Sequence, residues 1–310
     1  MSEATTIAAL LLPLEAYVRE RDAAGRELLA GIEAARDGLT DPQGPIAVAK
    51  ITALFEACAK ATGDPCFGIH YAEWFPAGGS GIFGHLFMSA ATIGEMLGLG
   101  VDYAELAVSP VTTSHRVEGD CSVFSFAYPS PAGKPATQFG TFLCALVVDR
   151  LRTVAGADWL PAGMVFAHPE PPLDAMPEYH RLFGRKLRFN SATYEFWISS
   201  DDLAIANPWT VSGLRGTVQK VADEALGARR EMPGFAGQVV QVIRAQLSEN
   251  GALQLSTVAR ALGVSPRSLQ QRLKHQKTSF EMLVVYVRVR LAEDLLGNSQ
   301  LPLGEIAHRL

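Results

Sequence analysis

The chain has 310 residues, 48% of them hydrophobic and 19% charged, a balance typical of a globular protein long enough for two ordinary domains. No apolar run approaches the ~18 residues of a membrane span, and the start lacks a signal peptide's basic segment, which predicts a cytoplasmic protein with no membrane partner. The net charge of −5 is uneven: residues 236–310 carry nine Lys and Arg against five Asp and Glu, so only this end is expected to approach a polyanion.

The first two-thirds of the chain mixes helical and strand patterns. Apolar residues recur at helical spacing over residues 51–58 and, more strongly, over 139–151. Residues 121–128 and 194–198 alternate between apolar and polar side chains, and 164–166 is a short apolar run between breakers, so all three are predicted strands. These elements predict a mixed α+β domain, and the pattern leaves the order of its strands open.

A glycine-rich stretch over residues 79–84 fits the G-x-G-x-x-G pattern of dinucleotide-binding loops. That fingerprint needs a buried strand before it, and residues 74–78 are a poor one, so we expect a tight loop before a helix and no cofactor. Trp74, His85 and Phe87 lie around this loop and are the candidate ligand-binding residues, since ligand pockets are mostly apolar with a few polar groups. The alternative is that Trp74 and Phe87 are ordinary core and His85 is a satisfied polar residue.

Patterns of catalysis and metal binding are missing from the sequence. The four cysteines and seven histidines lack the spacing of metal ligands, and no G-x-S-x-G elbow is present. Cys66, His70 and His115 can be combined into a nucleophilic site, but any chain of this length offers such combinations. The sequence therefore predicts neither an enzyme nor a metal protein.

The character of the chain changes at about Asn207, where strand signals vanish and helical periodicity takes over. The stretch R-R-E-M-P-G over residues 229–234 is polar and contains both proline and glycine, which is typical of a linker. We expect a first domain over residues 1–228, a linker over 229–236 and an all-helical domain over 237–310.

The start of the helical domain has the pattern of two short helices joined by a sharp turn. Ser256 is a suitable N-cap for the first helix, and the small Ala259 lets the second helix pack close. Gly263 suits the turn because glycine adopts positive φ without strain. Ser265 followed by Pro266 fits an N-cap with proline at the first helical position. An A-x-x-L-G-V-S turn leading into a basic helix is typical of a DNA-binding helix-turn-helix.

The second of these helices has one apolar side and one polar side. Leu269 and Leu273, at i and i+4, are expected to be buried. Arginine and glutamine on the other side can make bidentate contacts with base edges, and lysine or arginine can hold phosphates. The residues expected to contact DNA are Arg267, Ser268, Gln270, Gln271, Arg272 and Lys274. The alternative is an ordinary helical protein, although no acidic residue lies between Arg260 and Lys277.

A decapeptide is repeated on either side of a long predicted helix. Residues 278–281 resemble a capping box before an apolar helix over 280–296. Residues 253–262 recur as 301–310 at an offset of 48, with matching apolar positions. The first copy continues into the turn and the basic helix, whereas the sequence stops at the end of the second copy. We therefore expect residues 303–310 to be frayed, because the helix that would cover them is missing.

The run G-A-L-Q-L-S-T-V-A-R-A-L-G-V-S-P-R-S-L-Q-Q-R-L-K, followed by T-S-F and the second decapeptide copy, resembles the DNA-binding domain of AraC/XylS-type bacterial transcription regulators over about residues 236–310. The resemblance implies two helix-turn-helix units on either side of a linking helix, each with a recognition helix in the major groove of double-stranded operator DNA. Base reading is thereby assigned to Arg267, Gln270 and Gln271. Because a second recognition helix is missing, we expect operator binding to be weak.

The N-terminal part resembles a second known domain. The stretches I-T-A-L-F-E-A-C-A-K-A-T-G-D-P-C-F-G-I-H and G-I-F-G-H-L-F-M-S-A-A-T-I-G-E-M-L are similar to the arabinose-binding-type effector domain of a subset of these regulators. This resemblance implies a small-molecule sensor that also forms a homodimer, without making arabinose the effector. The chain is thus expected to be a ligand-responsive transcription regulator. The alternative is a small-molecule sensing and dimerisation module with impaired DNA binding.

Overall fold

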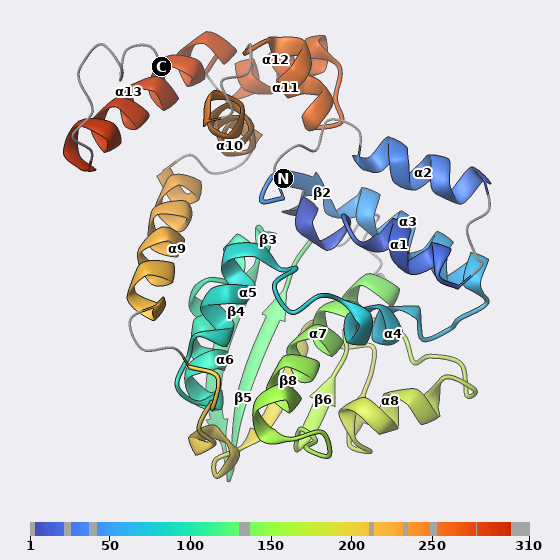
Figure 1. Cartoon of the computed structure of the whole chain (residues 1–310). Helices are drawn as coiled ribbons and strands as arrows, with labels where there is room; N and C mark the ends of the chain where they lie inside the picture. The colour runs from blue at the N-terminus through green and yellow to red at the C-terminus, as the bar shows by residue number, and fades with distance from the viewer. Residues whose placement is uncertain are drawn as a thin grey trace.

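The computed structural model describes residues 4–21, 26–36, 42–129, 137–210, 214–231, 235–248, 253–276 and 278–298 (Figure 1). Strands and helices mix up to residue 204, and from residue 214 onward every described element is a helix. The expected mixed α+β region followed by an all-helical region is therefore confirmed. Within the described ranges, no helix is long and apolar enough to cross a bilayer.

A small antiparallel sheet is built from three strands that are far apart in the chain. Its order is β2 (Pro45–Ala47), β1 (Thr5–Ile7) and β3 (Val108–Ser109). The helices that follow β1 and β2 are η1 (Ala8–Leu10), α1 (Leu14–Arg19), α2 (Arg26–Arg36) and α3 (Val48–Thr62). Because β1 is buried along its whole length, the beginning of the described chain is part of the core.

The larger sheet has five strands in the order β4 (Thr112–Glu118), β5 (Cys121–Ala127), β8 (Tyr194–Ser199), β6 (Gly163–Val165) and β7 (Leu187–Arg188). Neighbouring strands are antiparallel except β6 and β7, which are parallel. Phe124 lies opposite Phe196, and Phe126 opposite Tyr194, so the aromatic side chains of β5 and β8 share one face. The three strands predicted from the sequence are thus confirmed.

Helices cover this sheet, and two of them approach each other closely. Figure 1 shows α7 (Thr137–Ala155) lying across the sheet, and α7 packs against α4 (Phe67–Trp74). The glycine stretch at residues 79–84 leads into α5 (Gly81–Met88), and the element before it is helix α4 rather than a strand, as expected. The remaining helices of this part are α6 (Ile93–Asp102), η2 (Ala104–Leu106), α8 (Met176–Phe183) and η4 (Asp202–Ala204).

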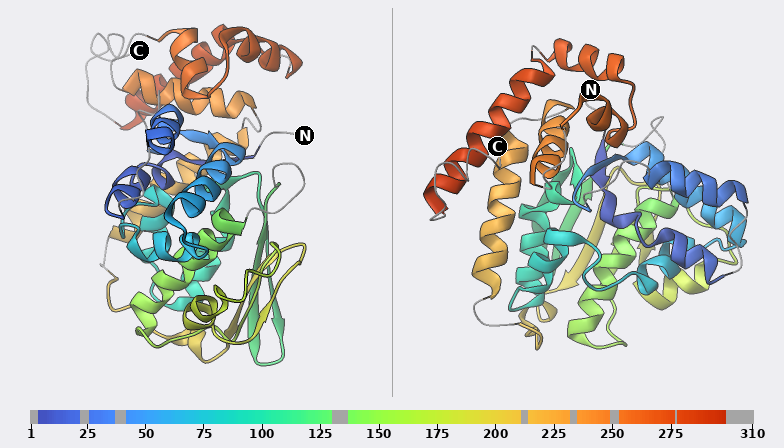
Figure 2. Two further views of the ribbon diagram at one scale, coloured as in Figure 1. Left: turned by 90° about the vertical axis from the view of Figure 1, so that its right-hand side faces the viewer. Right: turned by 45° about the horizontal axis from the view of Figure 1, so that its top comes forward.

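The helical part of the chain comprises α9 (Leu214–Glu231), α10 (Phe235–Ser248), α11 (Leu255–Ala261), α12 (Pro266–His275) and α13 (Phe280–Asn298). Figure 2 shows α10 to α13 gathered at one end of the molecule. Buried hydrophobic side chains form two separate clusters. Ala222 and Leu226 of α9 belong to the first cluster, whereas the second begins at Phe235. The break between the two cores therefore falls between α9 and α10.

Candidate nucleic-acid interface and internal cavity

α11 and α12 form a helix-turn-helix whose turn contains Gly263. Gly263 has a φ of +65°, and its N–H donates to the Arg260 carbonyl at 2.9 Å. The N–H of Val264 donates to the Ala259 carbonyl, also at 2.9 Å, and so closes the end of α11. A side chain at position 263 would strain this left-handed backbone even though the space beside it is open. The predicted turn glycine is confirmed.

Of the two caps predicted within the helix-turn-helix, one is present. Ser265 Oγ accepts a hydrogen bond from the Ser268 N–H at 3.1 Å and caps α12, with Pro266 in its first turn. The cap predicted at Ser256 is wrong, because α11 begins at Leu255 and its N-cap residue is Gln254. Including Leu255 in the helix lets it pack against the buried cluster, and this burial outweighs the capping preference of serine.

Burial fixes which side of α12 faces solvent. Leu269 and Leu273 are fully buried in the cluster formed with α10 and α13. The six predicted DNA-contact residues are exposed, apart from a half-buried Ser268: Arg267, Ser268, Gln270, Gln271, Arg272 and Lys274. The helix thus presents arginine and glutamine side chains outward from a fixed apolar base, which is the arrangement needed to reach base edges in a groove.

Two contacts with α10 orient α12, and sequence reasoning missed both. The Arg272 guanidinium lies 5.1 Å from the centroid of the Phe235 ring, a cation–π contact. Gln276, just after α12, accepts a hydrogen bond from the Ala236 N–H through its side-chain oxygen at 2.7 Å. Arg272 therefore has a structural contact as well as an exposed charge. Neither pairing leaves a periodic signal, because the partners lie in another helix.

The long helix α13 begins at Phe280, as predicted, and Ser279 Oγ accepts a hydrogen bond from the Met282 N–H at 3.3 Å. Its Leu283 and Val287 are buried in the second cluster. The second decapeptide copy, residues 301–310, lies outside the described residues, and so does the fraying predicted there.

A cavity of about 120 Å³ lies in the N-terminal part of the chain, between the larger sheet and helices α5, α6 and α7. Its walls are almost entirely apolar. The main side chains that line it are Phe83 and Phe87 from α5, Val101 from α6, Leu143 and Leu146 from α7, and Phe124, Phe126 and Phe196 from the sheet. Mostly apolar concave sites of this kind are where proteins bind small molecules.

Of the three predicted ligand-binding residues, only Phe87 lines this cavity. His85 is exposed on α5. Trp74 packs against Tyr17 and Tyr71, and its Nε1–H donates to Glu20 at 2.9 Å. Residues at i and i+2 of a helix do not share a face, so His85 and Phe87 cannot both point into one cavity. The structure therefore does not bring the three together, and the lining from α6, α7 and the sheet was missed because it comes from distant segments.

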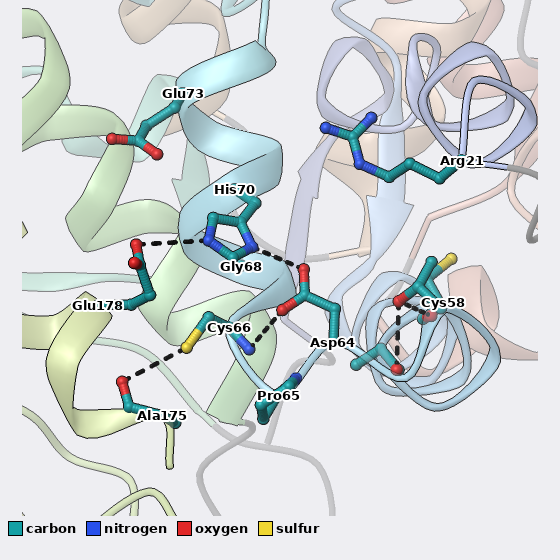
Figure 3. A network of polar contacts seen from close by, with 12 residues as sticks. Arg21, Cys58, Asp64, Pro65, Cys66, Gly68, His70, Glu73, Ala175 and Glu178 are labelled. Carbon is teal, nitrogen blue, oxygen red and sulfur yellow. Dashed lines mark hydrogen bonds and ion pairs between the residues drawn. The ribbon is translucent and has the colours of Figure 1, made fainter.

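A polar network around His70 joins α4 to α8 (Figure 3). His70 Nδ1 lies 2.7 Å from Asp64 Oδ2, and Nε2 lies 3.4 Å from Glu178 Oε2. The hydrogen bond with Asp64 raises the pKa of His70. Nearby, Cys66 Sγ donates to the Ala175 carbonyl, and burial raises the pKa of this thiol to about 12. The network therefore holds two helices together and lacks the thiolate that a nucleophilic site needs.

His115, the third residue of the possible nucleophilic site considered from the sequence, lies on β4. Its ring stacks on Phe124 from the neighbouring strand, with ring centroids 4.4 Å apart. Cys66, His70 and His115 are therefore not assembled into one site. In the described part of the chain, no group of three metal-ligating side chains comes together either.

His168 is a fully buried histidine beside the sheet. Its Nδ1 lies 2.7 Å from the Pro169 carbonyl, so this nitrogen donates. Nε2 then accepts from the Thr141 hydroxyl at 3.0 Å, and Thr141 accepts from Tyr179 at 2.8 Å. Burial lowers the pKa of His168 to about 4, so the ring is neutral and structural.

Comparison with known proteins gives one match for the N-terminal part and several for the whole length. A family model described as the arabinose-binding domain of AraC transcription regulator, N-term, matches residues 23–207. The ornithine utilization regulator of Pseudomonas aeruginosa is 26% identical over 285 residues, 87% of this chain and 78% of that protein. Uncharacterized HTH-type transcriptional regulators of Mycobacterium tuberculosis and Mycobacterium bovis are each 25% identical over 312 residues, 94% of this chain and 85% of theirs.

Among solved structures, the crystal structure of the transcriptional regulator CdpR from Pseudomonas aeruginosa covers 92% of this chain and 89% of that chain, at 20% identity and a TM-score of 0.47.

A mixed α/β region followed by a helix-turn-helix is the arrangement of a transcription regulator. The family model covers more than half of the chain, and the chain therefore belongs to the AraC-type transcription regulators with an N-terminal arabinose-binding-type domain.

Proposed function

We propose that the chain is a ligand-responsive regulator that binds double-stranded operator DNA through α12 and senses a small molecule in its N-terminal part. The observation that carries the DNA assignment is the exposed row of Arg267, Gln270 and Gln271 above buried Leu269 and Leu273. Arginine reads guanine and glutamine reads adenine through paired hydrogen bonds in the major groove. The phosphate contacts are assigned to Ser268, Arg272 and Lys274.

The proposed domain organisation is an effector-binding and dimerisation domain over residues 1–228, a linker over 229–236 and a DNA-binding domain over 237–310. The gap between the two buried clusters, from Leu226 to Phe235, supports this division. α9 ends at Glu231, so the first residues of the linker are helical.

We assign homodimerisation to the N-terminal domain. β4 is the outermost strand on one side of the larger sheet, no other described strand pairs with its outer edge, and its Val117 is 66% exposed. An open edge strand is suited to pairing with a second copy. Light scattering on the full chain should give the mass of a dimer, and the mass of a monomer at micromolar concentration would contradict the assignment.

The names of the family and of one relative mention arabinose and ornithine. Both molecules carry several polar or charged groups, whereas the cavity of this chain has an almost entirely apolar lining. We therefore assign neither of them to this chain as its effector.

Selection of binding sites from random DNA by the full chain tests the DNA assignment. Selected and scrambled duplexes are then compared by fluorescence anisotropy at about 0.15 M salt, where non-specific phosphate binding is weak. We expect the selected duplexes to bind at least about tenfold more tightly than the scrambled ones, since each bidentate base contact contributes about 1–3 kcal/mol of discrimination. Equal affinity for selected and scrambled duplexes would contradict the proposal.

A further inference from the structure

The cavity between α5, α6, α7 and the larger sheet is large enough for a small molecule. Its volume of about 120 Å³ is close to that of voids of ~150 Å³ in other protein cores, which hold benzene. Aromatic rings line it from two sides, with Phe83 and Phe87 on α5 and Phe124 and Phe126 on β5. A ligand the size of one aromatic ring matches this space.

The polarity of the lining restricts the ligand further. None of the described residues that line the cavity is charged, and its hydroxyl groups belong to Ser80, Thr113 and Ser125. Two of these already bond within the protein: Thr113 Oγ1 donates to the Val101 carbonyl at 3.1 Å, and Ser125 Oγ lies 2.7 Å from Ser114 Oγ. A charged ligand would lose its hydration here and gain no ion partner in return. An uncharged, mainly apolar ligand pays no such penalty.

The walls of the cavity are also the elements that hold α9. α9 packs against α5 and η2, which contribute Phe87 and Ala104 to the cavity. Tyr103 is the residue that joins α6 to η2 in the sequence, and its hydroxyl donates a hydrogen bond to Asp223 of α9. α9 is the last element before α10 of the second cluster, so the walls of the cavity contact the helix that leads to that cluster.

We propose that this cavity is the effector site and that it takes a small, uncharged, predominantly apolar molecule. The effector role rests on the ligand-responsive function proposed above, whereas the site and the ligand class rest on the cavity itself.

Isothermal titration calorimetry on the full chain tests the proposal with toluene as the apolar probe and with L-lysine and D-ribose as charged and polyhydroxy probes. Val147→Phe on α7 and Ala104→Phe in η2 fill the cavity from two different walls. Val154→Phe lies on the same helix as Val147 but outside the lining, and serves as the matched control. Circular dichroism checks that each variant is folded.

We expect toluene to bind the wild type and the Val154→Phe control alike, and each folded cavity-filled variant to lose at least about tenfold in affinity. L-lysine and D-ribose should give no heat of binding. The proposal is overturned if toluene does not bind the wild type, if it binds the filled variants as well as the control, or if either polar probe binds. The titrations contain no DNA, so failure of the DNA assignment leaves this result unaffected.

Discussion

His168 lies in the core as a neutral ring, fixed between the Pro169 carbonyl and the Thr141 hydroxyl. Its pKa of about 4 in the folded chain is below the value of ~6.5 for a free histidine, so the unfolded chain binds the proton more readily. The free energy of unfolding should therefore fall by a few kcal/mol, on the order of 3, as the pH drops from about 6.5 to about 4. His168→Gln should flatten this slope in urea titrations. An equally steep slope in His168→Gln would contradict this account.

The contribution of His70 to stability has the opposite dependence on pH from that of His168, because Asp64 and Glu178 favour the charged form of His70. Its pKa is raised in the folded chain, so its contribution to stability is full below the unfolded pKa of ~6.5 and is lost as the pH rises through the folded pKa. His70→Gln should remove this loss of stability above about pH 6.5. Thermal unfolding between neutral and mildly alkaline pH measures it, and a loss of the same size in the variant would count against the network.

At the scale of elements, Gly68 sets how closely α4 and α7 pack. A Cβ there would lie 2.3 Å from the Gln138 carbonyl oxygen, and the Gly68 N–H donates to Gln138 Oε1 at 2.9 Å. Gly68→Ala should destabilise the chain by about 1–3 kcal/mol, since backbone atoms cannot move aside as a side chain can. Gly98→Ala in α6, where nothing lies within 4 Å, should be neutral or stabilise by up to ~1 kcal/mol. Similar unfolding midpoints for the two variants would contradict the close approach.

The start of α12 allows a matched test of capping. Ser265 Oγ bonds the Ser268 N–H, whereas Ser256 lies inside the first turn of α11 and caps nothing there. Ser265→Ala should cost about 1 kcal/mol of stability, and Ser256→Ala should cost little. Chemical unfolding monitored by helical circular dichroism distinguishes the two, and equal losses would show that the cap does not hold α12.

At the scale of the whole molecule, the sequence predicted the elements better than their arrangement. Alternation identified β5 and β8 because each has one buried face, but their pairing depends on contacts between distant segments and leaves no local pattern. The sequence predicted the change to helical periodicity near Asn207, but it did not predict that α9 packs on the first core. Apolar residues such as Ala222 and Leu226 give the same helical pattern whichever core they join.

The two candidate sites also differ in how well the sequence predicted them. The DNA-facing row of α12 follows from helical spacing around Leu269 and Leu273, so local sequence was sufficient to predict its exposure. Residues from two sheets and several helices line the cavity, and of the three predicted ligand-binding residues only Phe87 is among them. A site built from distant segments has no periodic signal for a single sequence to show.

The measurement that tests the central claim most directly is the ratio of affinities for selected and scrambled duplexes in Arg267→Ala and Lys274→Ala. Arg267→Ala should weaken binding to selected DNA by about 1–3 kcal/mol and reduce the ratio, because a base contact is lost. Lys274→Ala should weaken both duplexes alike, and Arg185→Ala, an exposed arginine of the N-terminal part, should change neither. An unchanged ratio in Arg267→Ala would contradict the assignment of α12 as the helix that reads DNA.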